Sequence, residues 1–446
     1  MKAKGITRYL FAKILQKPSY EIGFWSILSL LMIHFTTPEY LKYWYIISAM
    51  IVMNCLMYHH IVELYTRKLK LFKVAYFVMF SAIVAMGVGT FAVPYISWNP
   101  FFRSVSTSLL LALVLIMQIS VAILSLGCLR KWSADFKGKS FSDAKCVGYF
   151  RSAVVAFALF FTLYLVGMLY GKNHLVVRRA EISMTSLPKN FEGYRIVHLS
   201  DFHLGSMYCH ATMKRMVDSV NAANADMIVF TGDFVTLCSK EALPYIGLLK
   251  QMKAKDGVFA VLGNHDYAKY PYYPSAEVKT ADSILLHSII RDSLGWTLMN
   301  DENKTITRGG QSIVVAGSQY IGLPSKSKIK LFGDNPYSFG DLAKTLQGLG
   351  NGNAVVLLTH NPVVWSRVIL QDYPFVGLTL SGHTHAGQMG YYKKKYSHQY
   401  STPDGKTKAG LYQYQNQYLY INSGIGTSAL HSRFLIFPEI TIVTLM

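Results

Sequence analysis

The chain has 446 residues, 51% of them hydrophobic, and a formal net charge of +20 at pH 7. Residues 1–171 consist largely of long apolar runs, whereas residues 172–446 have the composition and length of one soluble domain. This division counts against the alternative, in which the apolar runs are buried helices of a soluble protein. It predicts a transmembrane domain of about five helices, followed by a soluble domain.

Five apolar segments are candidates to cross a membrane. They cover residues 22–36, 44–57, 74–97, 106–128 and 152–170. The last three are long enough for a hydrocarbon core of ~30 Å. The first two are short and are separated by Pro38 and Glu39, so they form a tilted pair, an interfacial hairpin or one broken span. Because several spans follow and no small-residue cleavage site is evident, we expect no cleaved signal peptide.

The basic residues of the connecting loops predict a multi-pass protein of the cell membrane and its orientation. With five spans, fifteen Lys and Arg residues fall on the side of the amino terminus and two on the other side. We therefore expect a cytoplasmic amino terminus and an extracytoplasmic soluble domain. If the first two segments do not both cross, the soluble domain lies in the cytoplasm, an alternative that Lys172, Arg178 and Arg179 favour.

Both halves of the chain are basic, with net charges of +12 and +8. A basic domain attached to a bilayer attracts anionic lipid headgroups, at ~1 kcal/mol for each cation near the surface, and anionic phosphate substrates. A basic surface that is merely solvated is an equally good interpretation. The sequence contains no nucleic-acid recognition motif, so we expect membrane lipids and no nucleic acid as partners. The oligomeric state is not predicted.

The soluble domain has the alternating strand and helix patterns of an α/β fold. Its apolar, strand-like runs cover residues 195–200, 227–231, 258–262, 354–359 and 376–380. Helical patterns cover residues 211–223, 241–253, 281–294 and 342–349.

Each of the five strands stops at side chains that commonly bind metals. In a parallel sheet, the carboxyl ends of neighbouring strands meet at one crevice. Carboxylate, imidazole and amide donors at that place suit two divalent transition-metal ions that hydrolyse a phosphate ester. Glycines in these blocks let the loops turn sharply toward the crevice. The polar residues in question are Asp201, His203, Asp233, Asn264, His265, Asp266, His360, His383 and His385.

The blocks occur in the order D-x-H, G-D, G-N-H-D, a lone His and G-H-x-H, between Val197 and Gly387. This order resembles the calcineurin-like metallophosphoesterase superfamily. The phrases VHLSDFHLG, VLGNHDY, SGHTHAGQ and INSGIGTS resemble its membrane-anchored, bacterial phosphodiesterase-type branch. A vertebrate transmembrane protein with a metallophosphoesterase domain has the same layout. The resemblance implies a four-layer αββα sandwich for residues 172–446.

The resemblance also implies a role for each ligand around two divalent ions, which are Mn, Fe or Zn. A water between the ions becomes a hydroxide placed for in-line attack on phosphorus. The first ion is held by Asp201, His203 and His385, the second by Asn264, His360 and His383, and both are bridged by Asp233.

Two neighbours of the ligands have other expected roles. His265 is the candidate catalytic residue, which protonates the leaving oxygen or stabilises the pentacoordinate phosphoryl group. Asp266 is expected to orient nearby polar groups. Many family members read G-D-x-x-D in the second block, with the later Asp supporting the histidine. Here Thr236 takes that place, which puts the pKa of His265 in doubt.

The substrate-binding residues are less clear from the sequence. Tyr270 lies in an aromatic loop after the third block, and this loop either stacks on a substrate, enters the bilayer interface or is a Pro-stiffened surface loop. Arg433 is a candidate phosphate contact. The basic run at residues 393–395 is more typical of a solvated surface.

Three functions remain open at this point. The chain is a phosphodiesterase or pyrophosphatase for a lipid headgroup, a general extracytoplasmic phosphodiesterase for soluble nucleotides, or a membrane sensor with a metal-binding domain. Few charged residues occur within the spans, which counts against the sensor.

Overall fold

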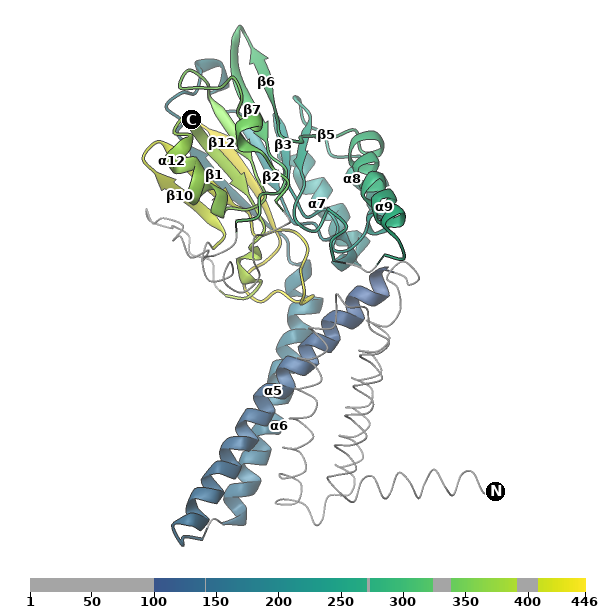
Figure 1. Ribbon diagram of the computed structural model, residues 1–446, viewed down its shortest axis with the longest axis vertical. Helices are drawn as coiled ribbons and strands as arrows, with labels where there is room; N and C mark the ends of the chain where they lie inside the picture. The colour runs from purple at the N-terminus through teal and green to yellow at the C-terminus, as the bar shows by residue number, and fades with distance from the viewer. Residues whose placement is uncertain (1–99, 141, 271–272, 324–337, 391–407) are drawn as a thin grey trace, which may run out of the picture. The chain divides into compact units, whose positions relative to one another are not determined.

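The computed structural model describes residues 100–140, 142–270, 273–323, 338–390 and 408–446 (Figure 1). The chain divides into two compact units. Ser106–Tyr164 belongs to the first unit, whereas Asn99–Val105 and Leu165–Met446 form the second. The predicted spans at residues 22–36, 44–57 and 74–97 lie outside the described residues.

Two long helices, α5 (Pro100–Phe136) and α6 (Asp143–Leu169), contain the other two predicted spans. Both are long and apolar enough to cross a membrane, which indicates membrane association. The helices lie side by side, and polar groups connect them in the first unit (Figure 1). Ser108 Oγ lies 2.8 Å from the Tyr164 hydroxyl, and Ser120 Oγ donates to the carbonyl of Ala153. Large apolar side chains, Val155 among them, stay exposed on the outer faces.

The second unit contains two six-stranded sheets. In the first, β2 to β5 are parallel to one another, and β12 runs antiparallel to β2 but parallel to β1. Its spatial order is β1 (Val176–Ile182), β12 (Glu439–Leu445), β2 (Arg195–Leu199), β3 (Met227–Thr231), β4 (Val258–Val261) and β5 (Thr297–Leu298).

In the second sheet, β7, β8, β9 and β11 are parallel, and the two edge strands run antiparallel. Its spatial order is β10 (Gly410–Tyr414), β11 (Gln417–Ile421), β9 (Val376–Ser381), β8 (Val355–Leu358), β7 (Gln311–Gly317) and β6 (Glu302–Arg308).

Short helices and turns connect the strands. The α-helices of this unit are α7 (His210–Ala222), α8 (Ile246–Leu249), α9 (Ala276–Ser288), α11 (Leu342–Thr345) and α12 (Leu370–Asp372). The 3₁₀ turns are η3 (Gly171–Asn173), η4 (Lys189–Phe191), η5 (Leu204–Ser206), η6 (Ser239–Glu241), η7 (Leu243–Tyr245) and η10 (His385–Gly387). The π turns are η8 (Ile289–Ser293) and η9 (Trp365–Ile369).

Alternate residues of each central strand face opposite sides of its sheet. Ile196 and Leu358, from different sheets, pack in the core between the sheets. Val197 packs with Met213 of α7 on the outer face of the first sheet, and Trp365 packs on the outer face of the second. Both faces of each sheet are therefore buried, which explains why the central strands are continuous apolar runs.

The predicted α/β domain with two sheets is confirmed. All five predicted strands form, with ends within one residue of the predicted bounds. The pattern at residues 211–223 forms α7, and that at residues 281–294 is divided between α9 and η8. The predicted helix at residues 241–253 forms only short turns and α8, with Pro244 near the start of η7, where its missing N–H is tolerated.

Replacement of Trp365 by Ala should destabilise the second unit by about 3–5 kcal/mol, because it leaves a cavity in the core on the outer face of the second sheet. Thermal unfolding in detergent should show a fall in the melting temperature on the order of 10 °C. Leu243→Ala removes a side chain that is 50% exposed and should leave the melting temperature nearly unchanged. Equal effects of the two substitutions would contradict this account of the core.

Candidate metal centre

The nine polar residues singled out in the sequence all follow the carboxyl ends of strands. Those from the first sheet follow β2, β3 and β4, and those from the second follow β8 and β9. Since these strands are parallel within each sheet, their ends lie along one edge. The two edges meet, so that side chains from both sheets converge in one place.

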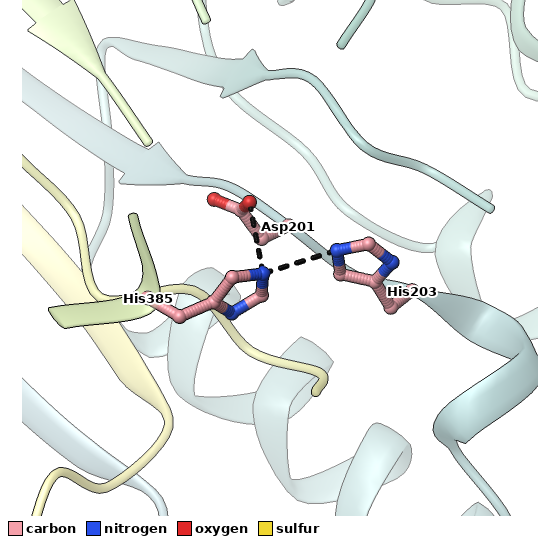
Figure 2. A group of neighbouring side chains, drawn as sticks. All are labelled: Asp201, His203 and His385. Carbon is pink, nitrogen blue, oxygen red and sulfur yellow. Dashed lines mark hydrogen bonds and ion pairs between the residues drawn. The ribbon is translucent and has the colours of Figure 1, made fainter. Parts of the chain in front are cut away.

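The first cluster contains Asp201, His203 and His385 (Figure 2). Nε2 of His385 lies 3.3 Å from Asp201 Oδ1 and 3.1 Å from Nε2 of His203. All three residues are buried. Two residues that follow β2 are thus joined by one that follows β9, across the two sheets.

The second cluster contains Asp233, His360 and His383. Oδ2 of Asp233 lies 3.1 Å from Nε2 of His360, and His383 Nδ1 lies 3.1 Å from that same nitrogen. Oδ2 of Asp233 also lies 3.4 Å from Nε2 of His203 in the first cluster. One carboxylate oxygen therefore touches both clusters, which is the arrangement that a bridging ligand requires.

Asn264 follows β4 and has one side-chain polar atom without a hydrogen-bond partner among the described residues. Its side-chain N–H donates to the Tyr270 hydroxyl at 2.7 Å. Its Oδ1 is buried and accepts no hydrogen bond from the described residues. An unpaired buried oxygen is unfavourable unless a cation or a water meets it, so this atom fits a metal ligand.

The donor set fits divalent ions as a whole. Within each cluster, one ligand atom of every residue lies within 4.8 Å of the others. Imidazole, carboxylate and amide oxygens are ligands that Mn, Fe and Zn all accept. A third group, His203, Asp233 and His265, meets the same distance criterion, so geometry alone does not exclude His265 as a ligand.

Most of the candidate ligands have a strained backbone. The left-handed conformation costs a non-glycine residue about 1–3 kcal/mol and persists mainly at functional sites. Here the positive φ angles belong to Asp201 (49°), His203 (41°), Asp233 (58°), His383 (71°) and His385 (48°).

Glycines allow the ligand loops to approach one another closely. Some are required for a positive φ, and others because there is no room for a side chain. Gly232 has a φ of 97°. A Cβ on Gly263 would lie 2.2 Å from Asp233 Oδ1, and one on Gly382 would lie 2.2 Å from Asp201 Oδ2. Gly263 and Gly382 have no positive φ and are required because the carboxylates pass directly over them.

The ionisable side chains of the centre shift one another's pKa values. Burial alone would raise the pKa of Asp233, but His360 and His265 outweigh it and hold that pKa well below its usual range. Burial, together with the Asp233 charge, raises the pKa of Asp266 to about 7. Burial lowers the pKa of His265 to about 4. Asp233 is therefore the anionic centre of the cluster.

Asp266 connects two of the ligand loops, as expected of an orienting residue. Its Oδ1 accepts from the backbone N–H groups of Phe234 and Val235, and its Oδ2 accepts from that of Gly263. The loop after β3 is thereby fixed against the loop after β4. The backbone N–H of His265 completes the connection by donating to Asp233 Oδ1 at 2.9 Å.

Thr236 stands where many family members have an Asp that supports the histidine, and its main chain takes over that contact. Nδ1 of His265 lies 2.7 Å from the backbone carbonyl of Thr236, so the main chain supports the ring in place of a side-chain carboxylate. Glu241, which sequence analysis did not single out, holds this loop. Its buried carboxylate accepts from the N–H groups of Thr236, Leu237 and Gly205.

Tyr270 contacts the centre itself. Its ring stacks on His265, with the ring centroids 4.2 Å apart, while its hydroxyl holds the Asn264 amide. Tyr320, also missed from the sequence, places its ring 5.9 Å from those of His360 and His383. It follows β7, a strand that was not predicted from the sequence.

Arg433 differs from the expectation of a phosphate contact. Its side chain is fully buried and donates to the carbonyls of Ser423 and Gly426. Its Nη2 lies 3.3 Å from Nδ1 of His385, on the side of the ring away from the first cluster. The guanidinium therefore packs behind a candidate ligand and does not face a substrate.

Asp233→Asn should remove bound metal, because the amide keeps the shape of the side chain but loses the negative charge that both clusters share. Elemental analysis of the purified protein should show metal content falling to background. Asp218→Asn is the matched control, since it neutralises an exposed carboxylate on α7. Full metal retention in Asp233→Asn would contradict the bridging geometry.

Tyr270→Phe should weaken the binding of metal by about 10-fold, because the Asn264 amide loses its acceptor. Stepwise Mn²⁺ titration measures this, and the ring stack on His265 is kept. Tyr273→Phe is the control in the same loop, since its hydroxyl donates to Asp282 at 2.7 Å. If both variants bind Mn²⁺ as the parent does, the hydroxyl has no role in positioning Asn264.

Comparison with known proteins agrees with this site. The calcineurin-like phosphoesterase family matches residues 194–387, which contain every candidate ligand. A metallophosphoesterase of Bacillus subtilis, YkuE, is 31% identical over 284 residues, covering 62% of this chain and 87% of the relative. The UDP-2,3-diacylglucosamine pyrophosphatase LpxG of Chlamydia trachomatis is 28% identical, covering 61% of this chain and 91% of the relative.

A transmembrane protein with metallophosphoesterase domain from Danio rerio is 29% identical over 59% of this chain, and the match spans 56% of that relative's length. The similarity of all three relatives covers about the length of the second unit. The chain therefore belongs to the calcineurin-like metallophosphoesterase family and is a metal-dependent phosphoester hydrolase.

Proposed function

We propose that the protein is a membrane-anchored phosphodiesterase or pyrophosphatase with two divalent ions, and that its substrate is a lipid with a phosphorylated headgroup. The observation that carries the two-ion site is the single Asp233 oxygen that contacts a histidine of each cluster. The apolar helices α5 and α6 and the similarity to the chlamydial pyrophosphatase support a lipid substrate.

The side chains divide between the two ions in this proposal. When bound, such ions would stabilise charge on the phosphoryl oxygens and would lower the pKa of a coordinated water molecule. Asp201, His203 and His385 hold one ion, Asn264, His360 and His383 hold the other, and Asp233 is shared. The metal is Mn, Fe or Zn.

His265 is the proposed catalytic residue. Its Nδ1 is held by the Thr236 carbonyl, so we assign its Nε2 to the substrate. The Tyr270 ring, which is stacked on the imidazole, restricts its rotation. The ring is thus oriented before the substrate binds.

The membrane part of the proposal concerns residues 1–171. They form a multi-pass domain, with residues 172–446 as the hydrolase outside the cytoplasm. This arrangement brings site and lipid substrate to the same interface. The basic charge of the hydrolase favours anionic headgroups there.

His265→Gln should lower kcat by about 10²- to 10⁴-fold, because the group that contacts the leaving oxygen is lost. Hydrolysis of bis(p-nitrophenyl) phosphate by the Mn²⁺-loaded protein measures kcat, and elemental analysis measures the metal in parallel. Metal content should equal that of the parent, since His265 is not one of the proposed ligands. Loss of an ion from this variant would make His265 a ligand instead.

The substrate class is tested with the full chain in mixed micelles. Turnover of a diacylated sugar nucleotide pyrophosphate is compared with that of ADP-ribose, a soluble pyrophosphate, at equal concentrations. Faster turnover of the lipid, rising with its surface fraction in the micelle, supports the proposal. Equal turnover of both would favour a general phosphodiesterase on soluble nucleotides.

A further inference from the structure

One loop links the end of α6 to the first metal cluster. Residues 422–438, here termed the C-terminal loop, connect β11 to β12. The loop and the final residues of α6, from Leu165 onward, belong to the same compact unit. Its two sides make different contacts.

The inner side of the C-terminal loop packs against two candidate ligands. The backbone N–H of Gly426 donates to the carbonyl of Asp201 at 2.8 Å. Gly424 has no room for a side chain, since a Cβ there would lie 2.7 Å from Asp201 Cβ and 3.2 Å from His385 Nδ1. A shift of this loop therefore moves Asp201 and His385 together.

The outer side of the C-terminal loop packs against the end of α6. The backbone N–H of Arg433 donates to the Gly167 carbonyl at 3.1 Å. A Cβ on Gly171 would lie 1.9 Å from the Arg433 carbonyl oxygen. His431 adds a contact to the start of α5, with its Nε2 3.0 Å from Ser104 Oγ. Both apolar helices thus contact the loop within the second unit.

Arg433 joins the two sides. Its backbone lies against Gly167 and Gly171, and its buried guanidinium reaches Ser423, Gly426 and His385. An arginine presents its donors in a rigid, planar fork, so it fixes several acceptors at once. The side chain is fully buried, so it makes no contact with solvent.

We propose that Arg433 is a positioning residue for the metal centre and that the last turns of α6 hold it in place. The apolar helix is then a structural part of the site that binds the first ion, in addition to being an anchor. A displacement at the end of α6 should loosen Asp201 and His385 and leave the second cluster intact. This inference rests on the proposed function, in which those two residues are ligands.

Gly171→Ala tests the proposal in the full-length protein, because the added methyl group must displace the Arg433 carbonyl. Gly148→Ala is the matched control. Gly148 is on α6, and a methyl group there would meet no described atom within 4 Å outside its own helix. Mn²⁺ titration followed by electron paramagnetic resonance gives the affinity of each ion and shows whether the two ions are magnetically coupled.

We expect Gly171→Ala to lower the affinity for one ion by about 10- to 100-fold. This is the range found when groups that hydrogen-bond to metal ligands are changed. At two equivalents of Mn²⁺ per protein, the spectrum should change from that of a coupled pair to that of a single ion, with the control unchanged. Two ions bound with parental affinity in Gly171→Ala would overturn the inference. Failure of the parent protein itself to bind two ions would instead refute the proposed function.

Arg433→Lys and Arg433→Met separate positioning from general stability. Both shorten or remove the fork, whereas only the lysine keeps the positive charge. We expect both to lose the same ion as Gly171→Ala, with a smaller loss for the lysine and thermal unfolding of the occupied protein still cooperative. If folded Arg433→Met retains both ions at parental affinity, Arg433 does not position the centre, even should Gly171→Ala prove unstable.

Discussion

The buried carboxylate of Asp233 is the contact on which the centre depends. An isolated charge in the protein interior costs several kcal/mol even after relaxation. Here His203 and His360 lie within 3.4 Å of its Oδ2, and the His265 N–H donates to Oδ1. These partners follow strands of both sheets, so the charge is compensated only when the two sheets are packed together. The centre therefore depends on the packing of the two sheets against each other.

The packing of the two sheets compensates the unfavourable backbone conformation of the ligand loops. Five candidate ligands with positive φ represent on the order of 5–15 kcal/mol of unfavourable backbone conformation, at about 1–3 kcal/mol each. The buried strands on either side of each loop fix its ends, so relaxation of one loop would break contacts of the core. Tight loops in turn require glycine wherever a carboxylate crosses the main chain, as at Gly263 and Gly382. The rigidity of the centre thus comes from the fold.

Local sequence patterns determined the strands and the ligand blocks, and these were the features that could be predicted. A buried strand is a continuous apolar run, and a ligand such as His360 stands directly after it. The supports of the ligands could not be predicted, because each is formed between distant segments. The Thr236 carbonyl reaches His265 across 29 residues and Arg433 reaches His385 across 48. Arg433 shows the consequence: its charge suggested phosphate, whereas its burial among backbone carbonyls excludes that contact in this structure.

A hydrolase of membrane lipids faces a constraint that a soluble phosphodiesterase does not. Its substrate is confined to an interface, so productive binding requires the centre to hold a fixed orientation to the anchor. A flexible linker after the last apolar helix would leave that orientation free. Here η3 and β1 follow α6 within six residues, and α6 itself hydrogen-bonds the loop behind Asp201 and His385. The contact from Gly167 lies within the second unit, so the end of α6 is packed with the centre itself, and this is the contact that the proposed lipid hydrolase would use.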